Sequence, residues 1–320
     1  MSGTTWYSGE NYDPDPNMKI WLDGRIVPVA EARISVFDHG LLYGDGIFEG
    51  IRSYNGRVFE GKAHLRRFFD CAKAISLQLP FPFERIEQAL DEALDANGLL
   101  NPTKDAYLRL VATRGVGVLG ISPRRTWKPQ VFVIAGTIGM YPAEMYQNGM
   151  PIIISSYTRN HPNAMPARIK SLNYLNNILA KIEAHDANVP EAIMLNHLGR
   201  VAEATGDNVF IVRGEQIQTP TTASGILEGI TRETVIRLAR DHGFEVVEKD
   251  LERFDLYAAD EIFLTGTGAQ VIGVSKIDNR FVGKGGVGPI TRTIMGLYEN
   301  FVRAAPGEHN AATRSVAATH

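Results

Sequence analysis

The sequence predicts a two-domain protein, with a small α+β domain at its N-terminus and a larger, strand-rich domain after it. Its 320 residues are enough for two hydrophobic cores. The first half combines two hairpins with two amphipathic helices, and the second half contains many short strands. These strands do not alternate regularly with helices, as they would in a doubly wound sheet. We therefore expect the second domain to be a barrel or a sandwich closed by helices.

The small domain is predicted over residues 18–137, after an arm at 1–17 that is rich in Gly, Pro, Asn and Asp. It begins with two hairpins, because the pairs Asp23-Gly24 and Asn55-Gly56 favour the positive φ angles of tight turns. Apolar residues then recur at helical spacing, and Gly98 supplies a helix stop. The helices and strands expected after the hairpins are 62–77, 84–97, "DAYLRLVAT" and "QVFVIAGT".

A segment rich in Gly and Pro, residues 138–150, is the expected linker to a large domain at 151–304. In "LNYLNNILAKIEAHDAN" the apolar spacing predicts a helix that already includes Leu172. Thr231 is expected to cap a second helix, and Pro289 to lie in the first turn of a third. The expected strands are "PIIISSY", "EAIMLN", "NVFIVRGEQIQTP", "FEVVEK", "EIFLTG" and "QVIGVSKI", and the polar tail at 305–320 is expected to be disordered.

Composition argues against several classes of protein. The net charge is −3 and both signs are interspersed, which argues against a basic surface for binding nucleic acid or an anionic membrane. The chain has neither the apolar core of a signal peptide nor an apolar run of the ~20 residues that a membrane span needs. Its eight histidines lack metal-ligand spacing. The single Cys71 is expected to be a buried thiol in a reducing compartment, so we expect a cytoplasmic protein without a metal.

Four features of the second half together suggest a site for an aldehyde cofactor that carries a phosphate. Lys170 stands just before an apolar-striped helix, and burial favours the uncharged amine that Schiff-base chemistry requires. Glu203 ends a predicted strand among small residues that leave room for a flat ring. Thr231 begins a helix, whose N–H groups can bind an anion, and "LTGTG" at 264–268 offers further donors.

At these residues the sequence resembles class IV aminotransferases, the fold-type IV enzymes that use pyridoxal 5′-phosphate (PLP), and specifically branched-chain aminotransferases. The resemblance runs from about Met18 to Phe301, which is most of the chain. It is carried by six blocks in the family's order: "HGLLYGDGIFEGIR", "HLRRFFDCAKAI", "IKSLNYLNNILAK", "EATGDNVFIV", "LEGITRE" and "FLTGTG". The joint specificity of these blocks is high.

The resemblance implies roles for residues around the cofactor. Lys170 resembles the catalytic lysine that binds the cofactor covalently and later moves the proton. Glu203 resembles the carboxylate that faces the pyridine nitrogen and keeps the ring an electron sink. Arg67 is similar to the phosphate-binding arginine, and Tyr174 to the tyrosine near the 3′-oxygen, although Tyr174 lies one residue nearer the lysine than in some members. The phosphate cup would be completed by Ile230, Thr231, Thr267 and Thr265.

The resemblance also implies a substrate pocket. Tyr43, Phe48 and Tyr141 look like the aromatic wall for a branched side chain, and Tyr107 and Arg109 resemble the pair that binds substrate carboxylates. In "LTGTG", Gly268 is the implied substrate-binding residue. The loop "RGVGVLGISP" is expected to reach the pocket of a neighbouring subunit, as it does in the family. This implies a homodimer or a larger homo-oligomer.

The implied reaction is transamination of leucine, isoleucine and valine, the branched-chain L-amino acids, with 2-oxoglutarate, giving branched 2-oxo acids and L-glutamate. A D-amino acid aminotransferase is an alternative on the same fold, but "FEGIR" and the lack of an Arg-x-His element after "TRG" argue against it. An (R)-amine transaminase and an aminodeoxychorismate lyase are further alternatives. The alternative from another class is a non-catalytic binding protein, which the intact Lys170 and Glu203 disfavour.

Overall fold

The computed structural model describes residues 15–304, which form two compact units. Unit 1 extends to Ile138 and includes Ile169–Tyr174, whereas unit 2 contains Gly139–Arg168 and the chain from Leu175 onward. Unit 1 is an α+β unit and unit 2 is rich in strands, as the sequence predicts. The predicted arm up to residue 14 and the predicted tail at 305–320 lie outside the described residues.

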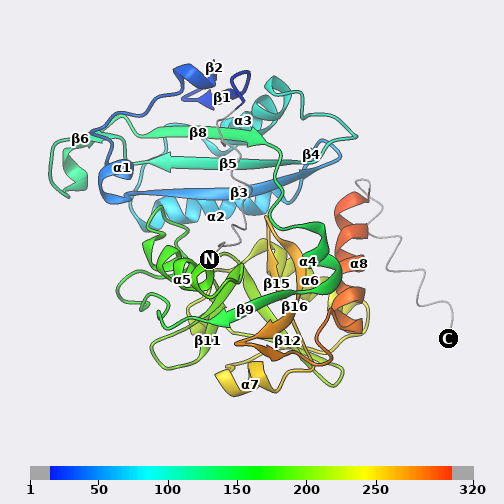
Figure 1. The fold of residues 1–320 in the computed structure, drawn as a ribbon. Coiled ribbons are helices and arrows are strands. Elements are labelled where there is room, and N and C mark those ends of the chain that lie inside the picture. Colours follow the sequence, from blue (N-terminus) through cyan, green and yellow to red (C-terminus); the bar gives the residue numbers. More distant parts are fainter. Residues whose placement is uncertain (1–14, 305–320) are drawn as a thin grey trace, which may run out of the picture. The chain divides into compact units, whose positions relative to one another are not determined.

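Unit 1 is built on a six-stranded antiparallel sheet in the order β2-β1-β8-β5-β3-β4 (Figure 1). Both predicted hairpins are present, and φ is positive at Asp23-Gly24 and at Asn55-Gly56. A short pair, β6 and β7, forms a separate ribbon. The strands are β1 (Lys19–Leu22), β2 (Arg25–Pro28), β3 (Gly46–Tyr54), β4 (Arg57–Val58), β5 (Ala106–Thr113), β6 (Val116–Gly117), β7 (Thr126–Trp127) and β8 (Gln130–Gly136).

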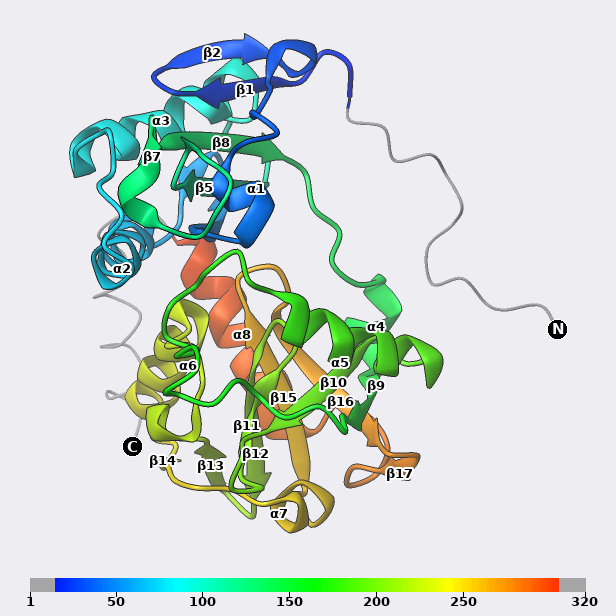
Figure 2. The same ribbon diagram turned by 90° about the vertical axis from the view of Figure 1, so that its left-hand side faces the viewer.

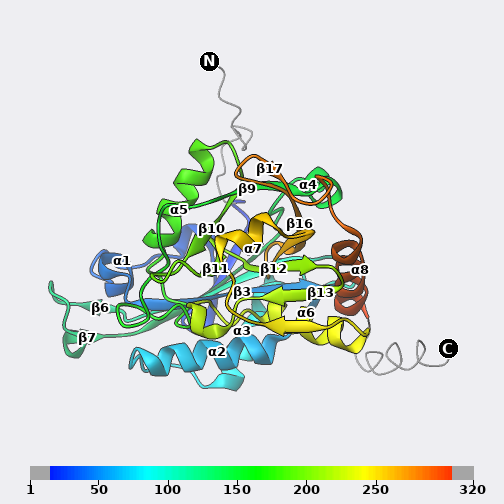
Figure 3. The ribbon, with the colours of Figure 1, turned by 90° about the horizontal axis from the view of Figure 1, so that it is seen from below.

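The helices of unit 1 are α1 (His39–Tyr43), α2 (Gly61–Ala74) and α3 (Phe83–Ala96). Figure 3 shows α2 and α3 side by side, and both contact the sheet. Their apolar faces bury residues such as Leu65 and Leu90 in one core with the inward side chains of β3, β5 and β8. Gly98 follows α3 with a φ of 62°, which confirms it as the helix stop.

Unit 2 contains a nine-stranded mixed sheet in the order β11-β10-β9-β16-β15-β12-β13-β14, with β17 paired to β16. The sheet is single, so the barrel-like expectation describes it better than a sandwich. Parallel pairs join β9 to β10 and β16, and β13 to β14. Its strands are β9 (Met150–Ile154), β10 (Glu191–Leu195), β11 (Val201–Ala204), β12 (Asn208–Arg213), β13 (Gln216–Thr219), β14 (Val246–Glu248), β15 (Glu261–Gly266), β16 (Gln270–Ile277) and β17 (Arg280–Phe281).

The helices of unit 2 are α4 (Ala143–Asn148), α5 (Leu175–Asp186), α6 (Ile230–Asp241), α7 (Arg253–Tyr257) and α8 (Pro289–Arg303). Figure 2 shows α6 and α8 as neighbours, and both contact β15. Pro289 lies in the first turn of α8, as predicted. No helix within residues 15–304 is both long and apolar enough to cross a membrane.

Four local features differ from the sequence-based expectations. The helix expected to include Leu172 begins only at Leu175, because the Leu172 N–H donates to the Gly46 carbonyl of β3 at 2.9 Å. That strand-like pairing also groups residues 169–174 with unit 1, whereas the large domain predicted over 151–304 includes them. Thr231 does not cap α6, whose N-cap is Gly229 without a side-chain cap. The expected linker contains the short helix α4.

A buried carboxylate lies on the core face of β3. Side chains alternate between the two faces of a strand, so Glu49 lies on the same face as Ile47 and Ile51. Its side chain is completely buried. Arg67 of α2 donates to it from Nε and Nη2, each at 2.7 Å, and His64 Nδ1 lies 2.8 Å from Oε2. Burial raises the pKa of Glu49, but Arg67 and His64 outweigh it and lower the pKa from 4.5 to about 2. The carboxylate is therefore ionised in the folded protein at neutral pH.

The lowered pKa predicts how stability depends on pH. Glu49→Gln should lower the free energy of unfolding by about 3–5 kcal/mol at pH 7, because it removes the carboxylate that pairs with the largely buried Arg67 guanidinium. As the pH falls from 4.5 towards 2, Glu49 takes up a proton in the unfolded chain before it does so in the folded protein. The stabilising contribution of the carboxylate is lost over this range, so the difference should narrow. Urea unfolding at several pH values measures both quantities. A difference that stays constant over this range would contradict the account, and Glu299→Gln, in the exposed ion pair with Arg303, is the control.

Candidate active site

The backbone of β3 positions Lys170. The Phe48 N–H donates to the Lys170 carbonyl at 3.0 Å, and Ser171 forms a bridge with Ile47. Since β4 pairs only with the far end of β3, the edge near Phe48 is open to this segment. The Lys170 N–H points the other way and donates to the Sγ of Cys71 at 3.4 Å. Cys71 is buried, as predicted, and burial raises the pKa of its thiol.

The ring of Phe48 brings three predicted site residues together. Lys170 Nζ lies 4.7 Å from the ring centroid, and Arg109 Cζ lies 4.6 Å from it. The ring of Tyr174 meets Phe48 edge-on at 5.0 Å, and the Tyr174 hydroxyl accepts a hydrogen bond from Lys170 Nζ at 3.2 Å. The half-buried amine of Lys170 therefore faces two aromatic rings and one hydroxyl.

Tyr107 and Arg109 form a pair on the same face of the sheet as Phe48. Arg109 Nη2 donates to the Tyr107 hydroxyl at 3.0 Å. Arg109 lies opposite Gly50 in the register of β3 and β5, and a Cβ at Gly50 would collide with the Tyr107 hydroxyl. Gly50 thus leaves the space that Tyr107 occupies. The pair that the sequence predicts is present, and its role towards carboxylates stays a prediction.

Glu203 is the centre of a polar network in unit 2. Its Oε1 lies 2.9 Å from both Nε and Nη2 of Arg159. Its Oε2 accepts from Asn208 Nδ2 at 3.2 Å and from the Leu227 N–H at 2.9 Å. These four donors fix the carboxylate at the end of β11. A ring N–H would share an oxygen with one of them or replace it, since a carboxylate offers about four acceptor positions.

The start of α6 lies beside this network. Asn208 also donates to the Leu227 carbonyl at 3.0 Å, and a Cβ at Gly229 would collide with Asn208 Oδ1. Ile230 and Thr231 occupy the first turn of α6, where backbone N–H groups have no acceptor within the helix. Thr265 of β15 lies opposite Asn208, and its buried Oγ1 has no hydrogen-bond partner among residues 15–304. A helix start and an unsatisfied hydroxyl therefore meet near Asn208.

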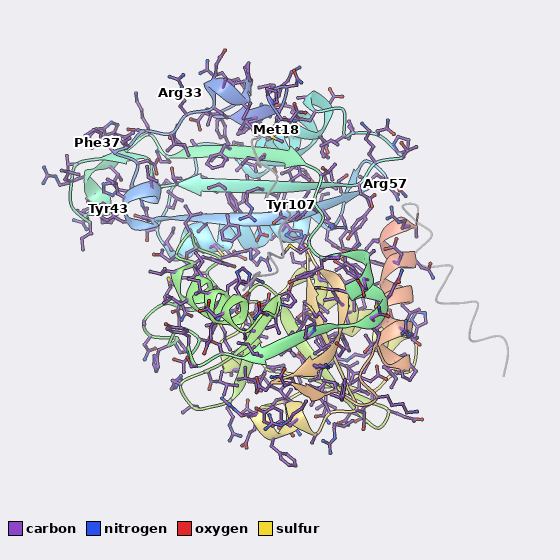
Figure 4. All side chains as sticks on the ribbon, viewed as in Figure 1. Met18, Arg33, Phe37, Tyr43, Arg57 and Tyr107 are labelled. Atoms are coloured by element: carbon purple, nitrogen blue, oxygen red, sulfur yellow. The ribbon has the colours of Figure 1, made fainter. Side chains whose placement is uncertain are left out.

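The remaining predicted residues are less tightly grouped. Thr267 and Gly268 lie in the turn between β15 and β16, where a Cβ at Gly268 would lie against Met140. The Tyr141 hydroxyl lies 3.4 Å from Glu191 Oε2, and its ring packs against the core of unit 2, so burial raises the pKa of Tyr141. Figure 4 shows Tyr43 at the α1 end of unit 1, away from Tyr107.

Four residues in these networks were not identified from the sequence. Glu49 and His64 stand inside matching blocks, and their proximity to Arg67 becomes visible only when β3 and α2 are packed together. Asn208 also stands inside a matching block, and Gly229 before α6 was the available signal of a close approach. Arg159 follows β9 in an irregular segment, and nothing in the sequence pattern pairs it with Glu203.

Comparisons with known proteins identify the family. The family model of amino-transferase class IV matches residues 46–277. A branched-chain-amino-acid aminotransferase of Pseudomonas aeruginosa is 37% identical over 296 residues, covering 91% of this chain and 94% of the relative. The structure is similar to a T.th. branched-chain amino acid aminotransferase complexed with N-(5′-phosphopyridoxyl)-L-glutamate, with a TM-score of 0.86, 39% identity and coverage of 92% of this chain and 97% of that one. It is equally similar, with a TM-score of 0.86 and 32% identity, to the Escherichia coli branched-chain amino acid aminotransferase, covering 91% of this chain and 97% of that one.

These matches extend over most of the chain and include both units. They confirm the fold class implied by the resemblance, a fold-type IV enzyme with a small α+β part and a larger part with a curled, barrel-like sheet. The chain therefore belongs to the class IV aminotransferase family.

Proposed function

We propose that this protein transfers the amino group of leucine, isoleucine and valine to 2-oxoglutarate. Pyridoxal 5′-phosphate is its cofactor, as in the related structures with phosphopyridoxyl and pyridoxamine groups. The observation that carries the proposal is the setting of Lys170, whose amine lies over Phe48 and donates to Tyr174. A lysine held by a strand edge beside aromatic rings and a hydroxyl suits a flat aldehyde cofactor.

The residues present fit this cofactor. The unsatisfied Oγ1 of Thr265 and the first turn of α6 offer donors for a phosphate group in unit 2. Arg67 offers a guanidinium in unit 1, and Glu203 offers a fixed carboxylate for a ring N–H. We propose that Lys170, Tyr174 and Arg67 of unit 1 take part in binding the cofactor. From unit 2 we assign Glu203 and the phosphate-cup residues Ile230, Thr231, Thr265 and Thr267 to the same role.

When bound, the cofactor supplies an aldehyde for the amino group and a ring that withdraws electrons from the α-carbon. Lys170 Nζ would hold the cofactor through its aldehyde group and would move the proton of the substrate α-carbon. The Tyr174 hydroxyl, which accepts from Nζ at 3.2 Å, orients the amine. Arg159 and Asn208 hold Glu203 so that its charge faces a fixed direction. These residues divide orientation and proton transfer between them.

Substrate recognition is assigned to Phe48, Tyr107 and Arg109, with contributions from Tyr43, Tyr141 and Gly268. The apolar ring of Phe48 suits a branched side chain, whereas the Arg109 guanidinium suits the distal carboxylate of glutamate or 2-oxoglutarate. Arg109 stacks on Phe48 and bonds to Tyr107, so both substrates would meet an arginine that is already oriented. One face of unit 1 can therefore serve the two half-reactions in turn.

A homo-oligomer is also part of the proposal. Several large apolar residues of unit 1 are strongly exposed, among them Phe37 (50%), Leu41 (65%), Leu119 (73%) and Ile121 (81%). Their two segments lie together, because the Gly117 N–H donates to the Phe37 carbonyl and the Gly120 N–H donates to the Tyr43 hydroxyl. Figure 1 shows α1 and β6 at one end of unit 1, and Figure 4 shows Phe37 and Tyr43 at that end. Exposed apolar residues gathered in this way favour a contact with a second copy, in which "RGVGVLGISP" would take part.

A panel of amino donors tests the proposed function. We expect L-leucine, L-isoleucine and L-valine to give L-glutamate from 2-oxoglutarate, and D-alanine and (R)-amines to give at least ~100-fold lower kcat/KM, which corresponds to about 2.7 kcal/mol of discrimination. Glutamate formation is followed by chromatography. A preference for D-amino acids or (R)-amines would replace the proposed substrate class, and elimination products from aminodeoxychorismate would replace the reaction.

Arg109→Gln tests the recognition of the two substrates. We expect the half-reaction with 2-oxoglutarate to slow about 10- to 100-fold and that with leucine to change little, because only the acidic substrate loses a charge-assisted hydrogen bond. Stopped-flow absorbance follows each half-reaction separately. Equal losses would assign Arg109 to the α-carboxylate, which both substrates share. Arg85→Gln is the matched control, since Arg85 also stacks on an aromatic ring, that of Trp21, at 5.1 Å.

The oligomer is tested by light scattering after size exclusion. The wild type should have at least twice the chain mass of 35.3 kDa, and the double substitution Leu119→Lys with Ile121→Lys should shift it towards the monomer. Phe254→Lys, at a residue of unit 2 that is 71% exposed, is the control that should leave the mass unchanged. A wild type that is monomeric at micromolar concentration would contradict this part of the proposal.

A further inference from the structure

The ion pair between Arg67 and Glu49 fixes the orientation of the guanidinium as well as neutralising its charge. Glu49 accepts from Nε and Nη2 of the same guanidinium, each at 2.7 Å, so the two planar groups lie fork to fork. The donors on Nη1 are not part of this fork. A bidentate pair fixes the plane of the guanidinium, whereas a single contact would let it rotate.

His64 completes the support of Glu49. It lies one helical turn before Arg67 on α2, so both side chains project from the same face towards β3. Its Nδ1 lies 2.8 Å from Glu49 Oε2, and its ring is almost completely buried. Burial lowers the pKa of His64 and outweighs the opposing effect of Glu49, with Arg67 and Lys170 acting in the same direction as burial. A neutral imidazole that donates from Nδ1 holds the carboxylate without adding a charge.

We propose that Glu49 and His64 are positioning residues that fix the Arg67 guanidinium for the phosphate group of the cofactor. This inference rests on the proposed phosphate-binding role of Arg67. The ion pair weakens the net charge that a phosphate would meet, so Glu49 would hinder phosphate binding if charge alone mattered. Fixing the orientation of Arg67 would instead favour phosphate binding, because an arginine that is already immobilised loses less conformational freedom on binding. The two effects predict opposite results when Glu49 is neutralised.

The test compares pyridoxal 5′-phosphate with pyridoxal, which lacks the phosphate, by isothermal titration of the full chain after removal of the cofactor. The ratio of the two affinities isolates phosphate recognition from binding of the ring. Arg67→Ala sets the loss expected when the guanidinium is absent. In Glu49→Gln we expect the ratio to fall at least about tenfold, with pyridoxal affinity unchanged within about twofold. A ratio that is unchanged or raised in Glu49→Gln would overturn the inference.

His64 provides a second, milder pair of variants in case Glu49→Gln does not fold. His64→Asn keeps an N–H donor near the position of Nδ1 and should retain the wild-type ratio. His64→Leu removes the donor and should lower the ratio at least about threefold. Equal ratios in the two variants would overturn the role of His64. Glu92→Gln removes another bidentate partner in unit 1, that of Arg85, and should leave the ratio unchanged.

The results for Arg67→Ala and Glu49→Gln also distinguish a failure of this inference from a failure of the proposed function. If Arg67→Ala leaves the ratio unchanged, Arg67 does not bind the phosphate, and the proposed cofactor site itself needs revision. If Arg67→Ala lowers the ratio but Glu49→Gln does not, the cofactor site stands and the positioning role is wrong. A lower melting temperature without a change of ratio would assign Glu49 a structural role only.

Discussion

The alternation of side chains along β3 is the constraint on which the arrangement of unit 1 depends. Phe48 and Glu49 are adjacent in sequence, so the strand must send them to opposite faces. One face receives Phe48, over which Lys170 and Arg109 lie, and the other receives Glu49, which holds Arg67. The backbone edge of the same strand binds the Lys170 segment. A shift of one residue in the register of β3 would exchange the two faces and separate all of these groups.

In unit 2, the Glu203 carboxylate and the start of α6 are held close together. The ends of β11 and β15 approach the turn before α6, and glycines stand where a side chain would collide with a neighbour. Gly229 gives room to Asn208, which bonds to both Glu203 and the Leu227 carbonyl. The Glu203 carboxylate and the start of α6 are therefore coupled through one amide, that of Asn208. A substitution at Asn208 would disturb both.

The sequence was most informative where local chemistry decides the structure. The two Asx-Gly turns, the helices α2 and α3 and most strands follow from turn residues and periodicity. The apolar spacing that predicted a helix through Leu172 was misleading, because residues 170–172 find their hydrogen-bond partners on β3, far away in the sequence. Lys170 was identified from its matching block, yet its neighbours Phe48 and Arg109 come from separate strands. Arg159 shows most clearly what could not be predicted from the sequence. It pairs with Glu203, which lies far away in the chain, and no motif or periodicity links the two residues.

Reduction by borohydride tests the central claim most directly, namely that β3 presents Lys170 to the cofactor. Borohydride converts the link between a lysine and pyridoxal 5′-phosphate into a stable amine, which peptide mass spectrometry can locate. The account predicts that the label is found on the peptide with Lys170 and disappears in Lys170→Ala. Lys181 is held by the Pro190 carbonyl and by Glu191, and Lys276 lies over the ring of Phe281. A label on either of these lysines would contradict the account.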